Sequence, residues 1–440
     1  MTQTPEKKIL RAWYLYDWAN SAFVTSLMAA LLPIYFREVA AAPAQPRYLA
    51  TSLWGYTAAF SMLLTTIVAL LLGPVADYAS RKKRFLAVFT GIGVAASLLL
   101  ACTGYGDWIW VALLYLLGTA GFAGSEIFYD SLLPHICRPD RIDQVSTRGY
   151  AAGYVGGGLV LALNIGLIML LPTRQLPDGL YAPVTGMKIS FLIVGLWWAL
   201  FSIPLFRRVP EPPGVQAGLQ GRSPFRVARL RLFETFREIR RYRELFVFII
   251  AFWFYNDGIG TIIKMATAYG SEIGISYLDL IGALLLTQII GVPCSLLFGR
   301  LAGQVGARNG ILTGLAVYTL ISVGGFFMRS ALHFWILAGM VGCVQGGTQA
   351  LSRSLFGSMV PGDRSAEFFG FYTISGKFSG IAGPALFALA GQLFGTSRFG
   401  ILSLVFFFVA GGIILLTVNV ERGIEAARFL TRDHLPKDNS

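Results

Sequence analysis

The sequence has little charge, little histidine and little cysteine for its length. Of its 440 residues only 13% are charged, against about 25% in an average soluble domain, and 55% are hydrophobic, with a mean hydropathy of +0.63. The three histidines and four cysteines show no metal-binding spacing, and there is neither a P-loop nor a Ser/His/Asp nucleophile set. We therefore expect no metal, no cofactor and no enzymatic activity, and we expect much of the apolar surface to face lipid.

Long apolar runs are what the sequence has in abundance. A helix needs about 20 mainly apolar residues to cross a bilayer, and unpaired backbone amides exclude open strands there. Twelve runs meet this length: Trp13–Phe36, Leu53–Leu72, Phe85–Cys102, Trp108–Leu133, Gly149–Leu171, Ile189–Phe206, Leu245–Ala268, Leu278–Phe298, Ile311–Met328, Phe334–Phe356, Phe368–Phe394 and Phe399–Val418. The sequence thus predicts an all-α membrane protein with twelve transmembrane helices.

The positive residues behind the net charge of +13 are unevenly distributed among the connections between these runs. With twelve spans both termini lie on one side, and most of the lysines and arginines fall on that side, so the positive-inside rule places both termini in the cytoplasm. Anionic lipid of the inner leaflet is the partner expected for this charge, and no nucleic-acid motif competes with it. We expect a monomer in a bacterial inner membrane.

The longest cytoplasmic connection divides the spans into six and six. Residues 207–244 begin with a Pro/Gly-rich linker and continue as "FRVARLRLFETFREIRRYRE", whose apolar residues recur at helical spacing between arginines. This pattern is typical of a basic amphipathic helix on the membrane surface, and a solvated linker helix is the alternative. We predict an N-terminal bundle at 1–206 and a C-terminal bundle with a cytoplasmic tail at 245–440.

The two halves repeat each other. "GSEIFYDSLLP" at Gly124–Pro134 returns 223 residues later as "GTQALSRSLFG" at Gly347–Gly357, and the same offset relates "GYVGG" to "GKFSG". "GPVADYASRKKR" at Gly73–Arg84 returns as "GRLAGQVGARNG" at Gly299–Gly310, with an offset of 226. Echoes in a consistent order indicate a duplicated six-helix unit, which is a transporter architecture.

The first copy of that loop resembles the signature loop of the major facilitator superfamily. Gly73, Asp77, Arg81 and Lys82 fit the G-x-x-x-D and basic-cluster pattern, although the usual Arg and Gly are replaced by "Y" and "S" in "DYAS". We expect a tight turn at Gly73 and a carboxylate that holds a helix end or a basic partner when the inner gate closes. A loop that is merely positively charged is the alternative.

A narrower resemblance covers nearly the whole chain. The blocks "YLYDWANSAF", "RGYAAGYVGGG", "WWALFSIPLF", "FYNDGIGTIIKMA" and "VQGGTQALSRSLFG" are similar to the family of the fungal vacuolar amino-acid effluxer of autophagy and its bacterial relatives. The resemblance implies export of amino acids across a membrane by a major facilitator fold of two pseudo-symmetric six-helix bundles.

Polar residues inside apolar runs are expensive and indicate a site. Asp17 and Asn20 share one face of the first run, either lining a cavity or wetted at its cytoplasmic mouth. Asn256 and Asp257 lie deep in the seventh run, where we expect Gly258 and Gly260 to let the helix break. We expect these four residues to contact substrate or a proton.

A lysine in the eleventh run completes this predicted site. Lys377 lies among small residues in "SGKFSGIAGP", where its ammonium can bind a substrate carboxylate or pair with Asp257.

Two neighbouring acids in the fourth run form the remaining cluster. Glu126 and Asp130 are one turn apart, so one of them must be paired or protonated. Asp130 can pair with Arg353, its repeat mate, or with Arg81, and Gln349 is the repeat mate of Glu126. The alternatives are a gate of ion pairs at Asp130 and Arg353, and direct contact of Glu126 and Gln349 with substrate or proton.

We conclude from the sequence that the chain is a secondary active transporter for a small polar solute. A zwitterionic amino acid fits the mixture of carboxylates and one lysine, a coupling proton or ion is possible, and export by alternating access is the expected direction. Two alternatives stay open: an exporter of lipid-like compounds, which would tolerate loss of Lys377, and a membrane sensor or scaffold without flux.

Overall fold

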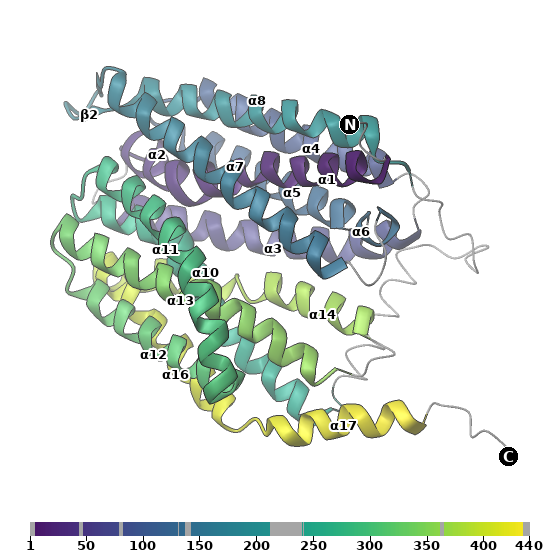
Figure 1. Ribbon diagram of the computed structural model, residues 1–440. Coiled ribbons are helices and arrows are strands. Elements are labelled where there is room, and N and C mark those ends of the chain that lie inside the picture. Colours follow the sequence, from purple (N-terminus) through teal and green to yellow (C-terminus); the bar gives the residue numbers. More distant parts are fainter. Residues whose placement is uncertain are drawn as a thin grey trace, which may run out of the picture. The chain divides into compact units, whose positions relative to one another are not determined.

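The computed structural model of the chain is almost entirely helical (Figure 1). It describes residues 5–43, 47–78, 82–130, 132–136, 142–211, 240, 242–360 and 365–433. The helices of the N-terminal part are α1 (Pro5–Ala22), η1 (Phe23–Leu31), α2 (Leu32–Tyr35), η2 (Phe36–Ala40), α3 (Tyr48–Tyr78), α4 (Lys82–Leu99), η3 (Leu100–Cys102), α5 (Trp108–Asp130), α6 (Leu133–Ile136), α7 (Ile142–Leu170) and α8 (Val184–Arg208). A small hairpin of β1 (Arg174–Gln175) and β2 (Tyr181–Ala182) links α7 to α8.

The C-terminal part continues in the same way. Its helices are α10 (Arg243–Glu272), α11 (Tyr277–Val305), α12 (Ala307–Phe326), α13 (Ala331–Ser358), α14 (Ser365–Phe378), α15 (Ala382–Phe394), α16 (Ser397–Leu416) and α17 (Val420–Asp433). Each of the twelve apolar runs falls on one of these helices or on consecutive ones, because a chain in lipid must pair its backbone amides within the segment. Eight helices within the described residues are long and apolar enough to cross a membrane.

Packing divides the chain into two compact units. The first unit is Met1–Ala228 together with Lys264–Leu285, and the second is Arg229–Ile263 together with Leu286–Ser440. Each unit is described by itself below. The division at 206 and 245 that the sequence suggests remains a prediction.

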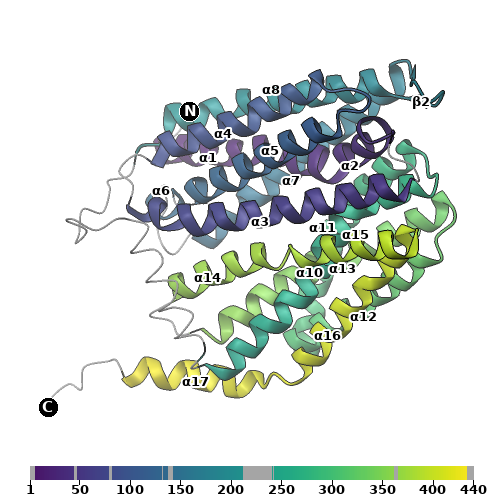
Figure 2. The same cartoon turned by 180° about the vertical axis from the view of Figure 1, so that it is seen from behind.

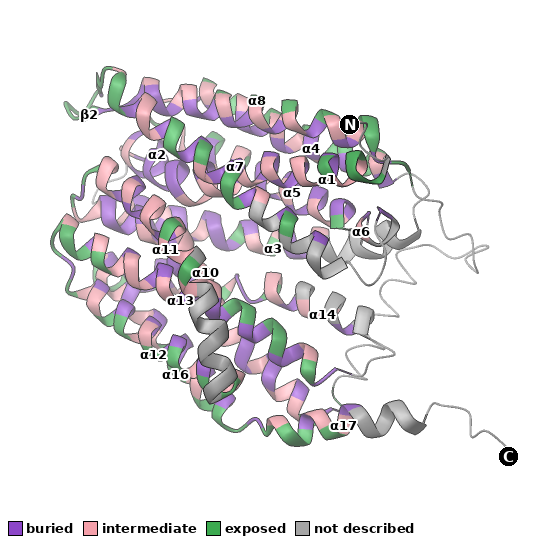
Figure 3. Ribbon diagram, in the orientation of Figure 1, coloured by how far each residue is buried: buried purple, intermediate pink, exposed green. Residues whose placement is uncertain are grey.

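The first unit is built around α1. This helix packs against α7 and α8, while α5 packs against α3 and α4. Trp13 stacks on Tyr129 with ring centroids 4.4 Å apart, within a core cluster that includes Phe128 and Leu205. Figure 3 shows this pattern, with buried residues turned inward and exposed residues on the outer faces. Exposed apolar side chains are what a helix bundle in lipid presents.

Residues Lys264–Leu285, which form the last part of α10 and the first part of α11, pack within this first unit. Trp54 donates its indole N–H to the carbonyl of Lys264 at 3.0 Å, and Thr267 donates its hydroxyl to the carbonyl of Ala29 at 3.1 Å. The guanidinium of Arg37, 4% exposed, donates from Nε to the hydroxyl of Ser271 at 2.9 Å. Arg37 also bonds the Ser271 carbonyl and Glu38, so its buried charge is paired.

The second unit is a bundle in which α12 packs against α13 and α16, and α15 packs against α16. Gly258 lets α10 approach α16, because a Cβ there would lie 2.7 Å from the ring of Phe408. The eleventh apolar run, Phe368–Phe394, is not one helix. It is split between α14 and α15, which follow each other with a break at residues 379–381 (Figure 2).

Two local expectations are wrong. The predicted break near Gly258 does not occur, because α10 runs without interruption from Arg243 to Glu272 and this glycine serves close packing instead. The turn predicted at Gly73 does not occur there either, because α3 continues through that residue to Tyr78. An isolated glycine in a helix is tolerated at a cost of about 1 kcal/mol, so packing can override it.

Candidate functional site

The break between α14 and α15 carries a group of buried and part-buried polar contacts in the second unit. The sequence "SGIAGP" explains its location: Ser379 and Gly380 end one helix, and Pro384 sits in the first turn of the next. Proline has no N–H and fits the first turn of a helix, so Pro384 favours a new helix start here. The break leaves a carbonyl end and an amide end that need partners.

Asn256 of α10 serves the carbonyl end. Its Nδ2 donates to the carbonyl of Gly376 at 3.2 Å and to the hydroxyl of Ser379 at 2.6 Å. The Ser379 hydroxyl in turn donates to the same Gly376 carbonyl at 2.8 Å. An amide donor therefore meets the negative end of α14.

Asp257, the next residue, serves the amide end. Its Oδ1 and Oδ2 both accept the backbone N–H of Gly383, each at 2.9 Å. Gly383 lies in the first turn of α15, where the helix dipole favours a negative charge. The carboxylate is 3% exposed, and this amide offsets part of the cost of burying it.

Gly383 is required by how closely α10 passes. A Cβ at this position would lie 2.6 Å from Oδ1 of Asp257 and 3.0 Å from its carbonyl oxygen, and would also collide with the hydroxyl of Thr261. Thr261 is itself fixed, because it donates to the Asp257 carbonyl at 2.7 Å. We call Asn256, Asp257, Ser379 and Gly383 the break clamp.

Lys377 lies in the last turn of α14, directly before the clamped break. It is half-buried, and within the described residues no hydrogen bond or ion pair holds its ammonium. The carboxylate of Asp257 accepts a hydrogen bond from the Gly383 N–H rather than from this lysine. The site therefore brings Asn256, Asp257 and Lys377 to one break, which leaves a cation for a ligand to meet.

The first unit carries an acidic cluster near the end of α1 and the end of α5. Asn20, 1% exposed, donates from Nδ2 to Oε1 of Glu126 at 3.2 Å. Asp17 is 8% exposed and interacts electrostatically with Glu126. Glycines of α7 bring that helix against it, since a Cβ at Gly153 would lie 3.3 Å from Oδ1 of Asp17. The structure thus joins Asp17, Asn20 and Glu126, which the sequence had treated as two separate groups.

The predicted gate residues lie on different elements of the two units. Asp130 is exposed at the end of α5, and Arg353 is exposed on α13 in the other unit, so their pairing remains a prediction. Asp77 lies on α3, where side chains are not described, and Arg81 lies outside the described residues. Lys82, 4% exposed, begins α4.

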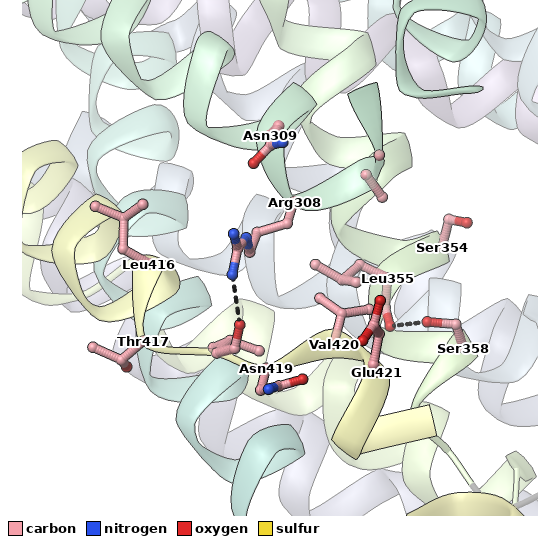
Figure 4. Close-up of a pocket in the computed structure, with 13 residues that line it drawn as sticks. Arg308, Asn309, Ser354, Leu355, Ser358, Leu416, Thr417, Asn419, Val420 and Glu421 are labelled. Atoms are coloured by element: carbon pink, nitrogen blue, oxygen red, sulfur yellow. Dashed lines mark hydrogen bonds between the residues drawn. The ribbon is translucent and has the colours of Figure 1, made fainter. Parts of the chain in front are cut away.

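Three polar side chains outside the predicted site make defined contacts, namely Ser352, Lys83 and Arg308. Gln349, a predicted site residue, is exposed. Ser352, three residues later on α13, shares a hydrogen bond with the hydroxyl of Tyr255 at 2.7 Å. Lys83 donates from Nζ to the carbonyl of Val209 at 2.7 Å, just beyond α8. In the second unit Arg308 does the same for the end of α16, because its Nη1 donates to the carbonyl of Val418 at 3.0 Å (Figure 4). The repeat of the basic loop, Gly73–Arg84 and Gly299–Gly310, is the sequence signal that could have indicated Lys83 and Arg308.

A polar hollow of about 680 Å³ lies beside Arg308, in the second unit (Figure 4). It is formed where α12 begins, α13 and α16 end, and α17 begins. Its walls include Asn309, Ser354, Asn419 and Glu421, and none of the predicted site residues line it.

Comparison with known proteins identifies the chain. The sequence profile of the family described as "Vacuole effluxer Atg22 like" matches residues 46–428. The "Uncharacterized MFS-type transporter YxiO" of Bacillus subtilis (strain 168) is 37% identical over 419 residues, which cover 95% of this chain and 96% of that protein. The chain belongs to the Atg22-like family.

Other relatives of this Atg22-like chain agree. "Autophagy-related protein 22" of Coccidioides immitis is 22% identical over 98% of this chain and 89% of that protein. Among solved structures, the nucleoside transporter NupG has a TM-score of 0.67 at 13% identity, covering 94% of this chain and all of NupG. The D-xylose-proton symporter has a TM-score of 0.66 at 13% identity and covers 97% of both chains. These structures show the fold.

The family and fold predictions are therefore confirmed. The Atg22-like chain is an all-α, multi-pass membrane protein with the major facilitator fold, and its relatives are transporters. It is a membrane transporter with a small-molecule substrate. The count of twelve spans and the choice of site residues remain predictions.

Proposed function

We propose that this Atg22-like transporter carries amino acids or similar zwitterions, and that Lys377 binds their carboxylate. The observation that carries the proposal is the clamped break between α14 and α15. Asn256 bonds the carbonyl end of α14 and Asp257 bonds the amide end of α15, so neither helix end at the break needs a ligand. The ammonium of Lys377 is the charge that the clamp leaves without a partner among the described residues.

A carboxylate is the natural ligand for such an ammonium. A half-buried lysine beside a low-dielectric interior gains more from an anionic partner than it would in water. Small residues next to it, Gly376 and Ser379, leave backbone and hydroxyl groups near the lysine rather than bulk. The names of the relatives support small polar cargo, since they include an effluxer, a nucleoside transporter and a xylose-proton symporter.

We further propose that transport is secondary, outward and coupled to a proton held by the acidic cluster of the first unit. Asn20 donates to Glu126, Asp17 interacts electrostatically with Glu126, and two like charges in one cluster can share a proton. The effluxer description supports the outward direction. We also propose that the protein is a monomer with cytoplasmic termini, and that a membrane-surface linker helix joins two six-helix bundles. We propose an inner gate at Asp77, Arg81, Asp130 and Arg353.

Proteoliposome counterflow with an amino-acid panel, with and without a proton gradient, tests the function. We expect uptake of at least one amino acid and poor uptake of its decarboxylated amine. Lys377→Ala should remove that preference, Lys377→Arg should keep part of it, and Lys188→Ala, at a half-buried lysine of α8, should change nothing. If no solute moves, a sensor or scaffold is favoured; if lipid-like compounds move and Lys377→Ala is silent, the amino-acid proposal fails.

A further inference from the structure

The polar hollow of Figure 4 lies at the end of an exposed apolar surface. On α16 the side chains of Phe406, Val409, Ile413 and Leu416 are between 44% and 59% exposed and recur at helical spacing. Leu416 is the last of them and is also a wall of the hollow. An apolar stripe of this helix therefore leads directly into a polar pocket.

A second stripe leads to the same place from α12. Leu320, Val323 and Phe327 are exposed on the face that, toward the start of the helix, carries Thr313 and the pocket residue Asn309. On the buried side the two helices meet through the stacked rings of Tyr318 and Phe408, whose centroids are 5.2 Å apart. Both stripes thus lie on the side of the α12–α16 pair that faces away from this contact.

The hollow itself contains one charge of each sign. Nη1 of Arg308 donates to the Val418 carbonyl, which holds the guanidinium at the pocket wall. Because a guanidinium has five N–H donors, others remain for a ligand. Glu421, exposed in the first turn of α17, supplies the carboxylate. Asn309, Ser354 and Asn419 add neutral donors and acceptors, and about 680 Å³ is ample for a phosphate ester with a short amine.

We propose that this hollow binds the headgroup of an aminophospholipid, with the acyl chains along the α12 and α16 stripes. Arg308 binds the phosphate, because arginine matches its geometry with two parallel N–H groups. Glu421 binds the ammonium. Apolar stripes that end at a pocket with both charges fit an amphiphile with a zwitterionic headgroup, whereas an anionic headgroup would meet the repulsion of Glu421.

The site has no part in the proposed solute site, since no residue of the break clamp lines it. Its function would be to hold α17 against the ends of α13 and α16. Asn419 already fixes the start of that helix, because its N–H donates to Oε2 of Glu244 at 2.7 Å and its side chain accepts the N–H of Arg422 at 3.1 Å.

Native mass spectrometry of delipidated protein in detergent tests the proposal. We would titrate phosphatidylethanolamine and phosphatidylglycerol with identical acyl chains, and in separate arms the free headgroup glycerophosphoethanolamine and inorganic phosphate. We expect phosphatidylethanolamine to bind about tenfold more tightly than phosphatidylglycerol, a difference of about 1.4 kcal/mol, and much more tightly than either soluble compound.

Variants separate the two charges. Arg308→Gln should weaken phosphatidylethanolamine binding about tenfold and Arg308→Lys should restore part of it, whereas Glu421→Gln should bring the two lipids to equal affinity. Arg329→Gln, at an exposed arginine beyond the other end of α12, is the matched control. Equal lipid binding that ignores Arg308→Gln overturns the proposal, and so does phosphate binding as tight as lipid binding. Thermal unfolding of Arg308→Gln and Arg308→Lys would show whether a lost fold explains a loss of binding; if only Arg308→Gln is misfolded, Glu421→Gln decides.

Discussion

The two units solve the same packing problem in different ways. In the first, α1 lies against α7, and in the second, α10 lies against α14 and α15. Tyr16 of α1 and Tyr255 of α10 are both buried, and each shares a hydrogen bond with a hydroxyl of a neighbouring helix, that of Thr90 on α4 and that of Ser352 on α13, each at 2.7 Å. An offset of 239 residues relates the two tyrosines and also relates Asp17 to Asn256. The first helix of each unit therefore carries a buried tyrosine followed by a polar residue.

The partner helices differ. α7 is continuous for 29 residues and approaches α1 through glycines, so that a Cβ at Gly156 would lie close to the backbone of Trp18. Its counterpart is interrupted, and Asn256 and Asp257 hold its two ends. A duplicated helix can thus give a close-packed support in one unit and a broken helix with a charged lysine in the other. We propose that this difference assigns the solute site to the second unit, while the first unit carries the acidic cluster.

Gly383→Ala should break this comparison most severely. The added methyl group would overlap Asp257 and Thr261, which have no room to move, so we expect a loss of about 3 kcal/mol in the free energy of unfolding and no transport. Denaturant titration in detergent measures the loss. Gly158→Ala in α7, where nothing lies within 4 Å, is the control. A fully stable Gly383→Ala protein would contradict the clamp.

Asp257→Ala should have the next largest effect. It leaves the Gly383 amide without its acceptor in a buried site, at a cost of about 2 kcal/mol, and it lets the break relax. Asp257→Asn keeps one acceptor oxygen and should lose about half as much, measured by the same titration. If Asp257→Asn abolishes transport while the protein is as stable as wild type, Asp257 acts on the solute or a proton rather than as a clamp.

Gly153→Ala tests the continuous side of the comparison. Its methyl group would lie 2.5 Å from the hydroxyl of Ser21, a small side chain that can rotate, and 3.3 Å from Asp17. We expect a loss of about 1 kcal/mol with transport reduced but present, measured by unfolding and by counterflow. A loss as large as that of Gly383→Ala would mean that both units are equally rigid here.

Glu126→Gln should have the smallest effect on stability and a selective effect on transport. The amide oxygen can still accept the N–H of Asn20, so the free energy of unfolding should change by no more than about 0.5 kcal/mol. Counterflow should persist while the response to a proton gradient is lost. Gradient-driven transport at the wild-type rate would remove the acidic cluster from the coupling proposal.

Part of this picture follows from the sequence. Apolar runs give the helices within a few residues, since lipid leaves the backbone no other structure, and the echoes between the halves indicate the duplication. The sequence leaves the register between the first and seventh runs open, because aligning Asn20 with Asn256 needs an offset of 236 residues and aligning Asp17 with Asp257 needs an offset of 240. The buried and hydrogen-bonded Tyr16 and Tyr255 are related by an offset of 239 instead.

The break was the feature hardest to predict. Glycine occurs both at Gly258 and Gly260 in α10 and at Gly380 and Gly383 around the true break. Which pair interrupts a helix depends on Pro384 and on Asn256 and Asp257, partners more than 100 residues away in the chain. A local pattern cannot report such a contact. Only the structure shows that the polar residues of one run cap the broken helix of another.

The direct test of the central claim is counterflow of an amino acid and of its decarboxylated amine through wild-type protein and Lys377→Ala. The clamp leaves Lys377 as the cation that meets the solute carboxylate, so wild-type protein should prefer the amino acid by about tenfold, which is about 1.4 kcal/mol. Lys377→Ala should transport both compounds at similar rates. A Lys377→Ala protein that keeps the full preference would contradict the account.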